Sequence, residues 1–224
     1  MKKRVFYTEI AFFLGLAFLS LGTSLTVYGD FGISMVVAPA YILHLYISKF
    51  LPFFTFGVAE YVVQAFVLLI LILIIRKAKF SYLLSFGATV FYGLCLDCAM
   101  RLTSLIPVDI YLRNILYLIG VFVCCASIAL MVSSYLPPEA YELFSKEISH
   151  KYNTKFHKIV NFYNYGSLFV SIILSFVFFG NIQGIGSGTV VCAIIYGFII
   201  KWFQRLYNKC FDFKDKFDLR KKFE

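Results

Sequence analysis

Charged side chains are scarce in this chain of 224 residues. Asp, Glu, Lys and Arg make up 15% of the sequence, whereas an average globular domain carries about 25%. Hydrophobic residues reach 61% and collect in long runs without any charge. Three such runs are Val62–Ile75, Ile115–Leu136 and Phe162–Ile200. This composition excludes an ordinary soluble protein and indicates a polytopic helical membrane protein, since one helix needs roughly 20 apolar residues to cross a bilayer.

The sequence also lacks the marks of several other protein classes. Five of the six cysteines lie within apolar runs, which argues against a secreted disulfide framework and makes these thiols small hydrophobic residues. No group of His, Cys, Asp and Glu has metal-ligand spacing, so neither a metal nor a cofactor is expected. The basic N-terminus resembles the start of a signal peptide, but no convincing cleavage site follows it. We therefore expect an uncleaved first span.

Six spans fit the apolar pattern. They are expected at Ile10–Tyr28, Phe54–Ile75, Ser81–Leu102, Tyr111–Val132, Ile159–Phe179 and Gly188–Arg205. The segment Ile33–Ser48 is apolar but too short to cross, so it is either re-entrant or interfacial. The segment Glu139–Lys151 is amphipathic and is expected to lie in the cytoplasmic interface. Its apolar helical face carries Tyr141, Phe144 and Ile148.

Basic residues set the expected orientation. The chain holds 21 Lys and Arg against 12 Asp and Glu, which gives a net charge of +9. With six spans, all of the basic residues except Lys49, Arg101 and Arg113 fall on one side of the membrane. The positive-inside rule makes that side cytoplasmic, with both termini on it, in a cell membrane whose anionic headgroups are a partner. Because the sequence offers no folded basic domain, nucleic acid is not an expected partner.

The two halves of the chain resemble each other. The matching stretches are Leu14–Val27 with Ile119–Val132, Tyr92–Gly93 with Tyr196–Gly197, and Glu60 with Asn164. Each half reads as a span, an interfacial or re-entrant segment, a second span, a short turn and a third span. Three is an odd number, so the halves must be inserted in opposite directions, as in many secondary transporters.

The expected fold is therefore all-α, with six transmembrane helices arranged as two inverted three-helix repeats. Residues 1–109 form the first three-span half and residues 110–206 the second. Residues 207–224 form a basic cytoplasmic tail. Each half contains one interfacial or re-entrant segment.

The glycine-rich stretch GNIQGIGSGT, Gly180–Thr189, resembles a phosphate-binding loop. It lacks the Walker lysine after Gly188 and follows a transmembrane helix rather than a strand, which argues against nucleotide binding. Two interpretations remain. Either the glycines form a tight turn that lets spans five and six pack closely, or the loop dips into the membrane and presents free N–H groups to an anion or a polar ligand.

The order of elements, the PPEAYELFSK segment and the GIGSGTVVCAIIYG stretch resemble the YczE/YyaS/YitT family of multi-pass bacterial membrane proteins. In that family a proline-containing segment and a short helix precede span five, and a G-x-G-T element opens the last span. Gly186–Thr189 matches that element here. Two features depart from the family pattern: FGISMVVAPA stands where a glycine–proline pair is usual, and no proline follows Tyr196–Gly197. The resemblance implies the fold and no defined activity.

Polar side chains inside the spans are the expected binding site, because ionisable residues within a bilayer usually face the protein interior. Glu60 is expected to accept a proton in a coupled transport cycle. Asp97 and Arg101 lie one helical turn apart, which suits an ion pair. The expected substrate-binding residues are Glu60, Gln64, Asp97, Arg101, Asn161, Asn164, Gly186, Gly188 and Thr189. No catalytic residue is expected.

These features predict a transporter or permease for an unknown small solute, with a polar site between two inverted halves. One alternative is a substrate-binding membrane subunit driven by a separate ATPase, although Ala11 and Ala17 of span one are too far apart for the usual docking pair. Another is a membrane regulator, or a thiol or quinone oxidoreductase that uses Cys95 and Cys98. A second copy of the chain and an energising subunit are both left open as partners.

Overall fold

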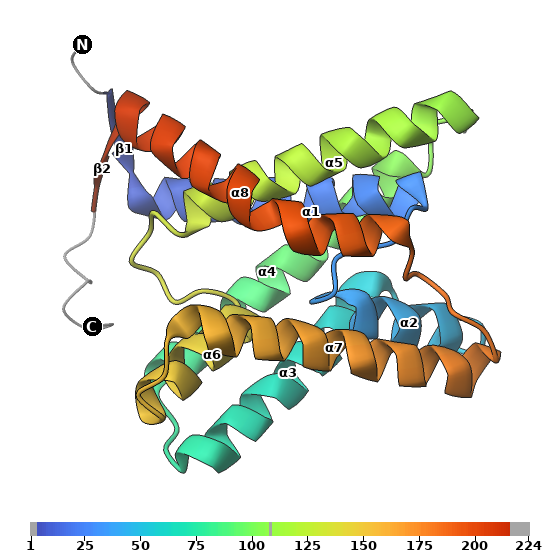
Figure 1. The fold of residues 1–224 in the computed structure, drawn as a ribbon, viewed down its shortest axis with the longest axis horizontal. Helices are drawn as coiled ribbons and strands as arrows, with labels where there is room; N and C mark the ends of the chain where they lie inside the picture. Colours follow the sequence, from blue (N-terminus) through green and yellow to red (C-terminus); the bar gives the residue numbers. More distant parts are fainter. Residues whose placement is uncertain (1–3, 108, 216–224) are drawn as a thin grey trace.

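The computed structural model describes residues 4–107 and 109–215 as a bundle of long helices (Figure 1). Its elements in chain order are β1 (Arg4–Tyr7), α1 (Thr8–Gly29), α2 (Ala38–Ile47), α3 (Phe56–Ile75), α4 (Phe80–Thr103), α5 (Ile110–Met131), α6 (Ala140–Lys151), α7 (Phe156–Phe179), α8 (Ser187–Cys210) and β2 (Phe211–Lys214). Within the described residues, six helices are long and apolar enough to cross a membrane: α1, α3, α4, α5, α7 and α8. The prediction of an all-α protein with six membrane-spanning helices is confirmed.

The outer faces of the last two spans are strongly apolar. Phe162 on α7 is 75% exposed and Phe198 on α8 is 74% exposed. Other exposed side chains on these two helices are Phe169, Ile173, Phe176, Val177, Val190 and Ile194. A soluble monomer rarely exposes so large an apolar surface. These faces suit contact with lipid tails, so the chain is an integral membrane protein.

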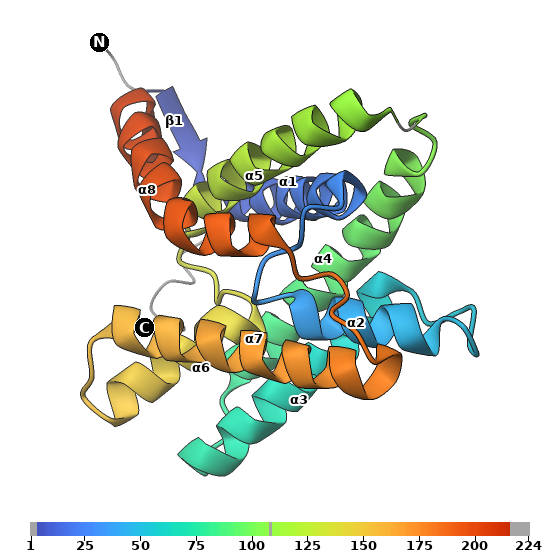
Figure 2. The same ribbon diagram turned by 45° about the vertical axis from the view of Figure 1, so that its right-hand side comes forward.

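The last helix is longer than expected. α8 continues to Cys210, into the segment expected as a basic tail, and Phe211–Lys214 then pairs in parallel with Arg4–Tyr7. Figure 2 shows β1 beside the C-terminal end of α8. The two ends of the described chain therefore lie on the same side of the molecule. The remaining predicted basic residues of the termini lie outside the described residues: Lys2, Lys3, Lys216, Arg220, Lys221 and Lys222.

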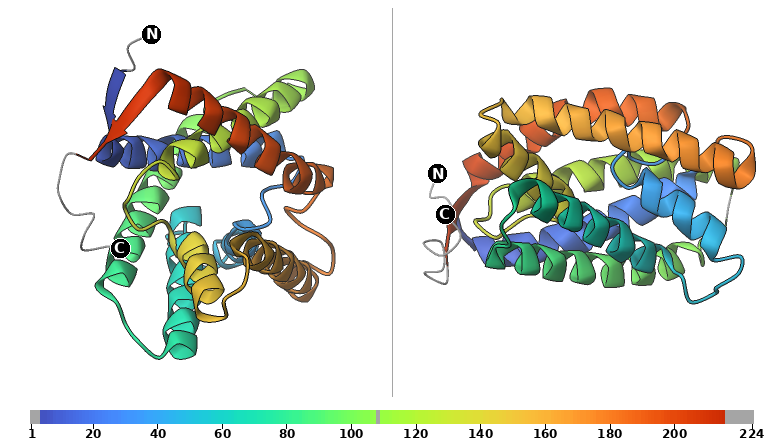
Figure 3. Two further views of the ribbon diagram at one scale, coloured as in Figure 1. Left: turned by 60° about the vertical axis from the view of Figure 1, so that its left-hand side comes forward. Right: turned by 90° about the horizontal axis from the view of Figure 1, so that it is seen from below.

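The helices form two groups that α4 connects. In the first group α5 packs against both α1 and α8. In the second group α3 and α7 each pack against the two short helices α2 and α6. α4 contacts α1, α3 and α6 and thereby joins the groups. Within the described residues α7 and α8 are not in extensive contact, and the two groups lie apart on that side (Figure 3).

Glycines bring α1 and α5 together along their length. Gly15, Gly22 and Gly29 recur at heptad spacing, so they share one face of α1, and this face packs against α5. A Cβ atom added at Gly22 would lie 2.6 Å from Sγ of Cys124 and 2.9 Å from the carbonyl oxygen of Gly120. Small residues allow membrane helices to approach backbone to backbone in this way.

The segment between α1 and α3 is re-entrant with respect to the bundle. After α1 the chain turns back towards the centre of the molecule, and α2 returns to the end at which α1 stops (Figure 1). The hydroxyl of Ser167, near the middle of α7, donates a hydrogen bond to the carbonyl oxygen of Met35 at 2.9 Å. This bond satisfies one backbone acceptor of a turn that has left regular structure inside the bundle.

The start of α6, the segment predicted to be interfacial, also lies inside the bundle. The backbone N–H of Ala140 donates to Oε1 of Gln64, near the middle of α3, at 3.1 Å. Ser85 of α4 donates to the carbonyl oxygen of Pro138. Ala140 is fully buried and Tyr141 is 5% exposed. The predicted amphipathic face exists, but polar side chains of α3 and α4 hold the first turn of α6 away from the surface.

Candidate functional site

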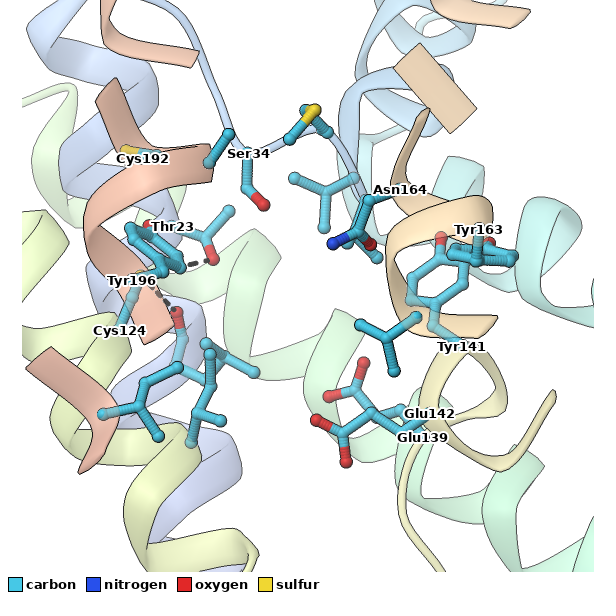
Figure 4. A pocket seen from close by; sticks show the side chains of 18 of the residues that line it. Thr23, Ser34, Cys124, Glu139, Tyr141, Glu142, Tyr163, Asn164, Cys192 and Tyr196 are labelled. Carbon is cyan, nitrogen blue, oxygen red and sulfur yellow. Dashed lines mark hydrogen bonds between the residues drawn. The ribbon is translucent and has the colours of Figure 1, made fainter. Parts of the chain in front are cut away.

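A cavity of about 350 Å³ lies between the two helix groups (Figure 4). Thr23 of α1, Cys124 of α5 and Tyr196 of α8 line one wall. Tyr141 of α6 and Asn164 of α7 line the opposite wall. Residues 34–37, which lead into α2, and one tyrosine of α4 also reach the cavity. Both predicted halves of the chain thus contribute to a single space.

The cavity wall is mainly apolar, with a few polar groups. Its apolar members include Leu19, Met35, Val36, Val37, Ile128, Met131, Val160 and Ile200. Among the described residues that line it, only Glu139 and Glu142 carry a charge, and none is a Lys, Arg or His. Pockets of about 300 Å³ or more, apolar with a few placed polar groups, are typical binding sites for small organic molecules.

The two glutamates reach the cavity from the start of α6. Glu139 occupies the position just before the helix, and Glu142 lies in its first turn. Figure 4 shows both carboxylates directed into the cavity from the same wall. Glu139 is 6% exposed, and its Oε1 atom has no hydrogen-bond partner among the described residues. Glu139 therefore lines the cavity with one carboxylate oxygen that no group in the described part of the chain satisfies.

A buried hydrogen-bond network joins Glu139 to α3 and α4. Nε2 of Gln64 donates to Oε2 of Glu139 and to Oε2 of Glu60, each at 3.2 Å. The hydroxyl of Tyr141 donates to the same Glu60 oxygen at 2.8 Å. The hydroxyl of Thr89 donates to Oε1 of Gln64 at 2.6 Å. Two carboxylates therefore share one amide donor.

The hydrogen-bond network around Glu139 contains two carboxylates and no basic side chain among the described residues. The ion pairs of the described residues lie elsewhere, at Lys79–Glu147, Arg113–Asp30 and Lys214–Asp212. Burial raises the pKa of Glu139 well above its usual range, the neighbouring carboxylates of Glu60 and Glu142 raise it further, and the hydrogen bond from Gln64 lowers it. Burial also raises the pKa of Glu142. Because isolated buried charges are costly, these carboxylates favour binding a proton or another cation.

A family model matches residues 6–205, nearly the whole chain, and is described as a family of unknown function, DUF6198. The chain belongs to the DUF6198 family. No curated protein and no solved structure matches it. The family therefore brings no activity with it, and the resemblance to the YczE/YyaS/YitT proteins stays a prediction.

Four of the predicted site residues of this DUF6198 protein meet at the cavity or directly behind it. Glu60 and Gln64 are fully buried members of the carboxylate network. Asn161 and Asn164 line the cavity from α7. The structure thus brings together the polar residues of spans two and five.

Asp97 and Arg101 do not form the predicted ion pair. Asp97 instead accepts hydrogen bonds from the hydroxyl of Thr55 at 2.6 Å and from the backbone N–H of Gly57 at 2.8 Å. Arg101 is exposed near the end of α4. The carboxylate accepts from one free N–H group at the start of α3, because the first turn of a helix has no internal acceptor for it. Neither residue lines the cavity.

The glycine turn also lies outside the cavity lining. The backbone N–H of Gly188 donates to the carbonyl oxygen of Phe31 at 2.8 Å, and that of Gly186 donates to the hydroxyl of Thr189 at 3.3 Å. Gly32 has a φ of +104° and lies directly against Gly186. The glycines therefore pack against the segment that follows α1. They do not bring α7 and α8 together as the tight-turn interpretation expected.

Sequence reasoning missed the two glutamates that point into the cavity. Glu139 and Glu142 belong to a helix that was expected at the membrane surface, where glutamate is solvated. The available signals were the Pro137–Pro138 pair and the repeat, which aligns this segment with the re-entrant one before α3. The cavity-lining Tyr92, Tyr163 and Tyr196 were missed because a chain with 16 tyrosines gives no sign of which ones meet.

Proposed function

We propose that this protein is a transporter of the cytoplasmic membrane that moves a small solute through the cavity between its two helix groups. The observation that carries the proposal is the cavity of about 350 Å³, lined from both halves of the chain and containing a buried carboxylate oxygen of Glu139 without a partner. A purely structural bundle gains nothing from such a group, since an unpaired buried carboxylate is destabilising.

The helix contacts support two inverted halves. If α1 to α4 correspond to α5 to α8, each contact in one half needs a counterpart. α1–α4 then matches α5–α8, and α2–α3 matches α6–α7. The contacts between the halves, α2–α7 and α3–α6, are counterparts of each other. Both short helices also begin inside the bundle and contact the middle of a span from the other half.

Two contacts break this correspondence: α4–α6 and α3–α4 have no comparable counterpart in α2–α8 and α7–α8 among the described residues. α3 packs closely on α4, and a Cβ atom added at Gly93 would meet the ring of Tyr61. The matching positions in the second half are Tyr165 and Gly197. Gly197 lines the cavity and has no atom within 4 Å of its position for a Cβ atom. α7 and α8 thus stand apart where α3 and α4 are closed.

This asymmetry supplies a mechanism for transport. In a second state of similar energy, α7 closes on α8 through Tyr165 and Gly197 while α3 parts from α4. The cavity then opens to the opposite side of the membrane. Exchange between two such states is the usual behaviour of inverted-repeat transporters, and Glu60 and Glu139 would take up a proton in one state and release it in the other.

Paired cysteines test the two states directly. In a background without the six native cysteines, one variant carries Tyr61→Cys with Gly93→Cys, and a second carries Tyr165→Cys with Gly197→Cys. A short bifunctional thiol reagent is expected to cross-link both pairs in membranes. Installing both pairs together and linking the first is expected to suppress linking of the second.

A contact that stays closed in both states serves as the control. This control carries Thr23→Cys and retains Cys124 as its only native cysteine; the pair joins α1 to α5, where the two polar atoms are now 4.0 Å apart. This pair is expected to cross-link fully in every sample. If it links and the Tyr61–Gly93 pair links, but the Tyr165–Gly197 pair never does, the two-state proposal is wrong.

The self-contained transporter is better supported than a binding subunit driven by a separate ATPase. Such a subunit docks through small residues on its first span, and the glycine face of α1 is already buried against α5. A redox role for Cys95 and Cys98 has no support from the cavity, because neither thiol lines it. The cytoplasmic placement of both termini rests on the basic loops at their end of the bundle.

A further inference from the structure

The charge and the aromatic content of the cavity identify the class of molecule that it suits. Its wall holds two carboxylates, Glu139 and Glu142, and no basic side chain among the described residues. An anionic solute would therefore meet repulsion and no compensating donor of opposite charge. A neutral solute without a hydrogen-bond donor would leave Oε1 of Glu139 buried without a partner, which is destabilising.

Four tyrosine rings surround the same space. Tyr92, Tyr141, Tyr163 and Tyr196 come from α4, α6, α7 and α8. Figure 4 shows Tyr196 on one wall and Tyr141 with Tyr163 on the facing wall. Aromatic faces attract cations, and they do so most strongly where water is excluded, as in the cages that bind quaternary ammonium groups.

The cavity does not suit a bare metal ion. No group of three or more His, Cys, Asp or Glu residues in the described part of the chain is arranged to hold one. Hard cations require several oxygen ligands in a closed shell, whereas most of this wall is aliphatic or aromatic. Because most of the wall is apolar, the cavity suits a ligand that has an apolar body. The volume of about 350 Å³ leaves room for such a body.

We propose, on the basis of the transport function above, that the cavity binds a compact organic cation, a protonated or quaternary amine, with its charge at Glu139 and its apolar body among the tyrosines. The cation and a proton then compete for the same carboxylate. Binding of the cation to protonated Glu139 releases that proton. The protein therefore exchanges the cation for a proton across the membrane.

Binding to the purified full-length protein tests this assignment. The probes are choline, its neutral analogue in which carbon replaces the quaternary nitrogen, the anion pivalate of similar shape, and the larger cation benzyltrimethylammonium. A ligand that binds the folded state alone raises the unfolding temperature by mass action. At least one of the cations is expected to raise it saturably, with proton release in weakly buffered solution, whereas the neutral analogue and the anion leave it unchanged.

Two matched pairs of variants locate the charge and the rings. Glu139→Gln is expected to weaken cation binding by on the order of tenfold or more, while Glu147→Gln, on the same helix but paired with Lys79 outside the cavity, leaves it unchanged. Tyr196→Leu is expected to weaken binding and Tyr196→Phe to retain it, because only the second keeps an aromatic face.

The outcomes separate this inference from the transport proposal. If the neutral analogue or the anion stabilises the protein as well as the cations do, or if no cation binds, the substrate class is wrong even when the paired cysteines alternate. If the cations bind and depend on Glu139, but the Tyr165–Gly197 pair never closes, the site stands and the transport proposal fails.

Discussion

Glu139 is a buried carboxylate that is costly to the fold. The groups that face it are Glu60 and Gln64 of α3, Tyr92 of α4, and Tyr141 and Glu142 of its own helix. None of these is basic, and only Gln64 donates a hydrogen bond to it. The carboxylate is therefore stable mainly when it holds a proton or a cation.

The stability of the protein is expected to fall as the pH rises. The pKa of Glu139 lies well above that of an unfolded glutamate, about 4.3, because of burial and the adjacent carboxylates. The folded state therefore binds the proton more tightly, and this contribution is lost as the pH rises through the folded pKa. Thermal unfolding in detergent is expected at a lower temperature near pH 8 than near pH 5.

The variant Glu139→Gln removes the titrating group and keeps a hydrogen-bond acceptor for Gln64. It is expected to be more stable than the wild type near pH 8 and to depend less on pH. Glu147→Gln, which changes an exposed ion pair, should keep the wild-type profile. Parallel pH profiles for the wild type and Glu139→Gln would show that this carboxylate does not bind the proton.

At the level of helices, the close approach of α1 and α5 fixes the first group. Their contact places Gly22 directly against Gly120 and Cys124. This frame fixes one wall of the cavity, and α8 packs on it through α5. In the second group, the two short helices join α3 to α7.

Gly22→Ala tests this packing. The added Cβ atom would lie 2.8 Å from the backbone nitrogen of Cys124, so the helices would have to separate. We expect a loss of about 1–3 kcal/mol, typical of overpacking, seen as a lower unfolding temperature. Gly87→Ala on α4, where no atom lies within 4 Å of the new Cβ, should be neutral or stabilising. Equal effects of the two substitutions would contradict the packing role.

For the whole molecule, long uncharged apolar runs such as Phe162–Ile200 were sufficient to predict the six spans, because each crossing needs roughly 20 apolar residues. The sequence also singled out Glu60 and Asn164, which the structure places behind the cavity and in its wall. What could not be predicted was which polar groups meet. The start of α6 enters the bundle because Gln64 and Ser85 bind it there, and no local pattern around Glu139 encodes those distant partners.

Accessibility of the cavity from both sides of the membrane decides whether the protein transports at all. A single cysteine at Asn164→Cys, in a background without native cysteines, is exposed to a membrane-impermeant maleimide in right-side-out and in inverted vesicles. Single cysteines at Lys155→Cys and Asn181→Cys, at opposite ends of α7, report the orientation and should each react from one side only. We predict that the cysteine at position 164 reacts in both kinds of vesicle. Reaction from one side alone, or from neither, would mean that the cavity does not alternate between the two faces of the membrane.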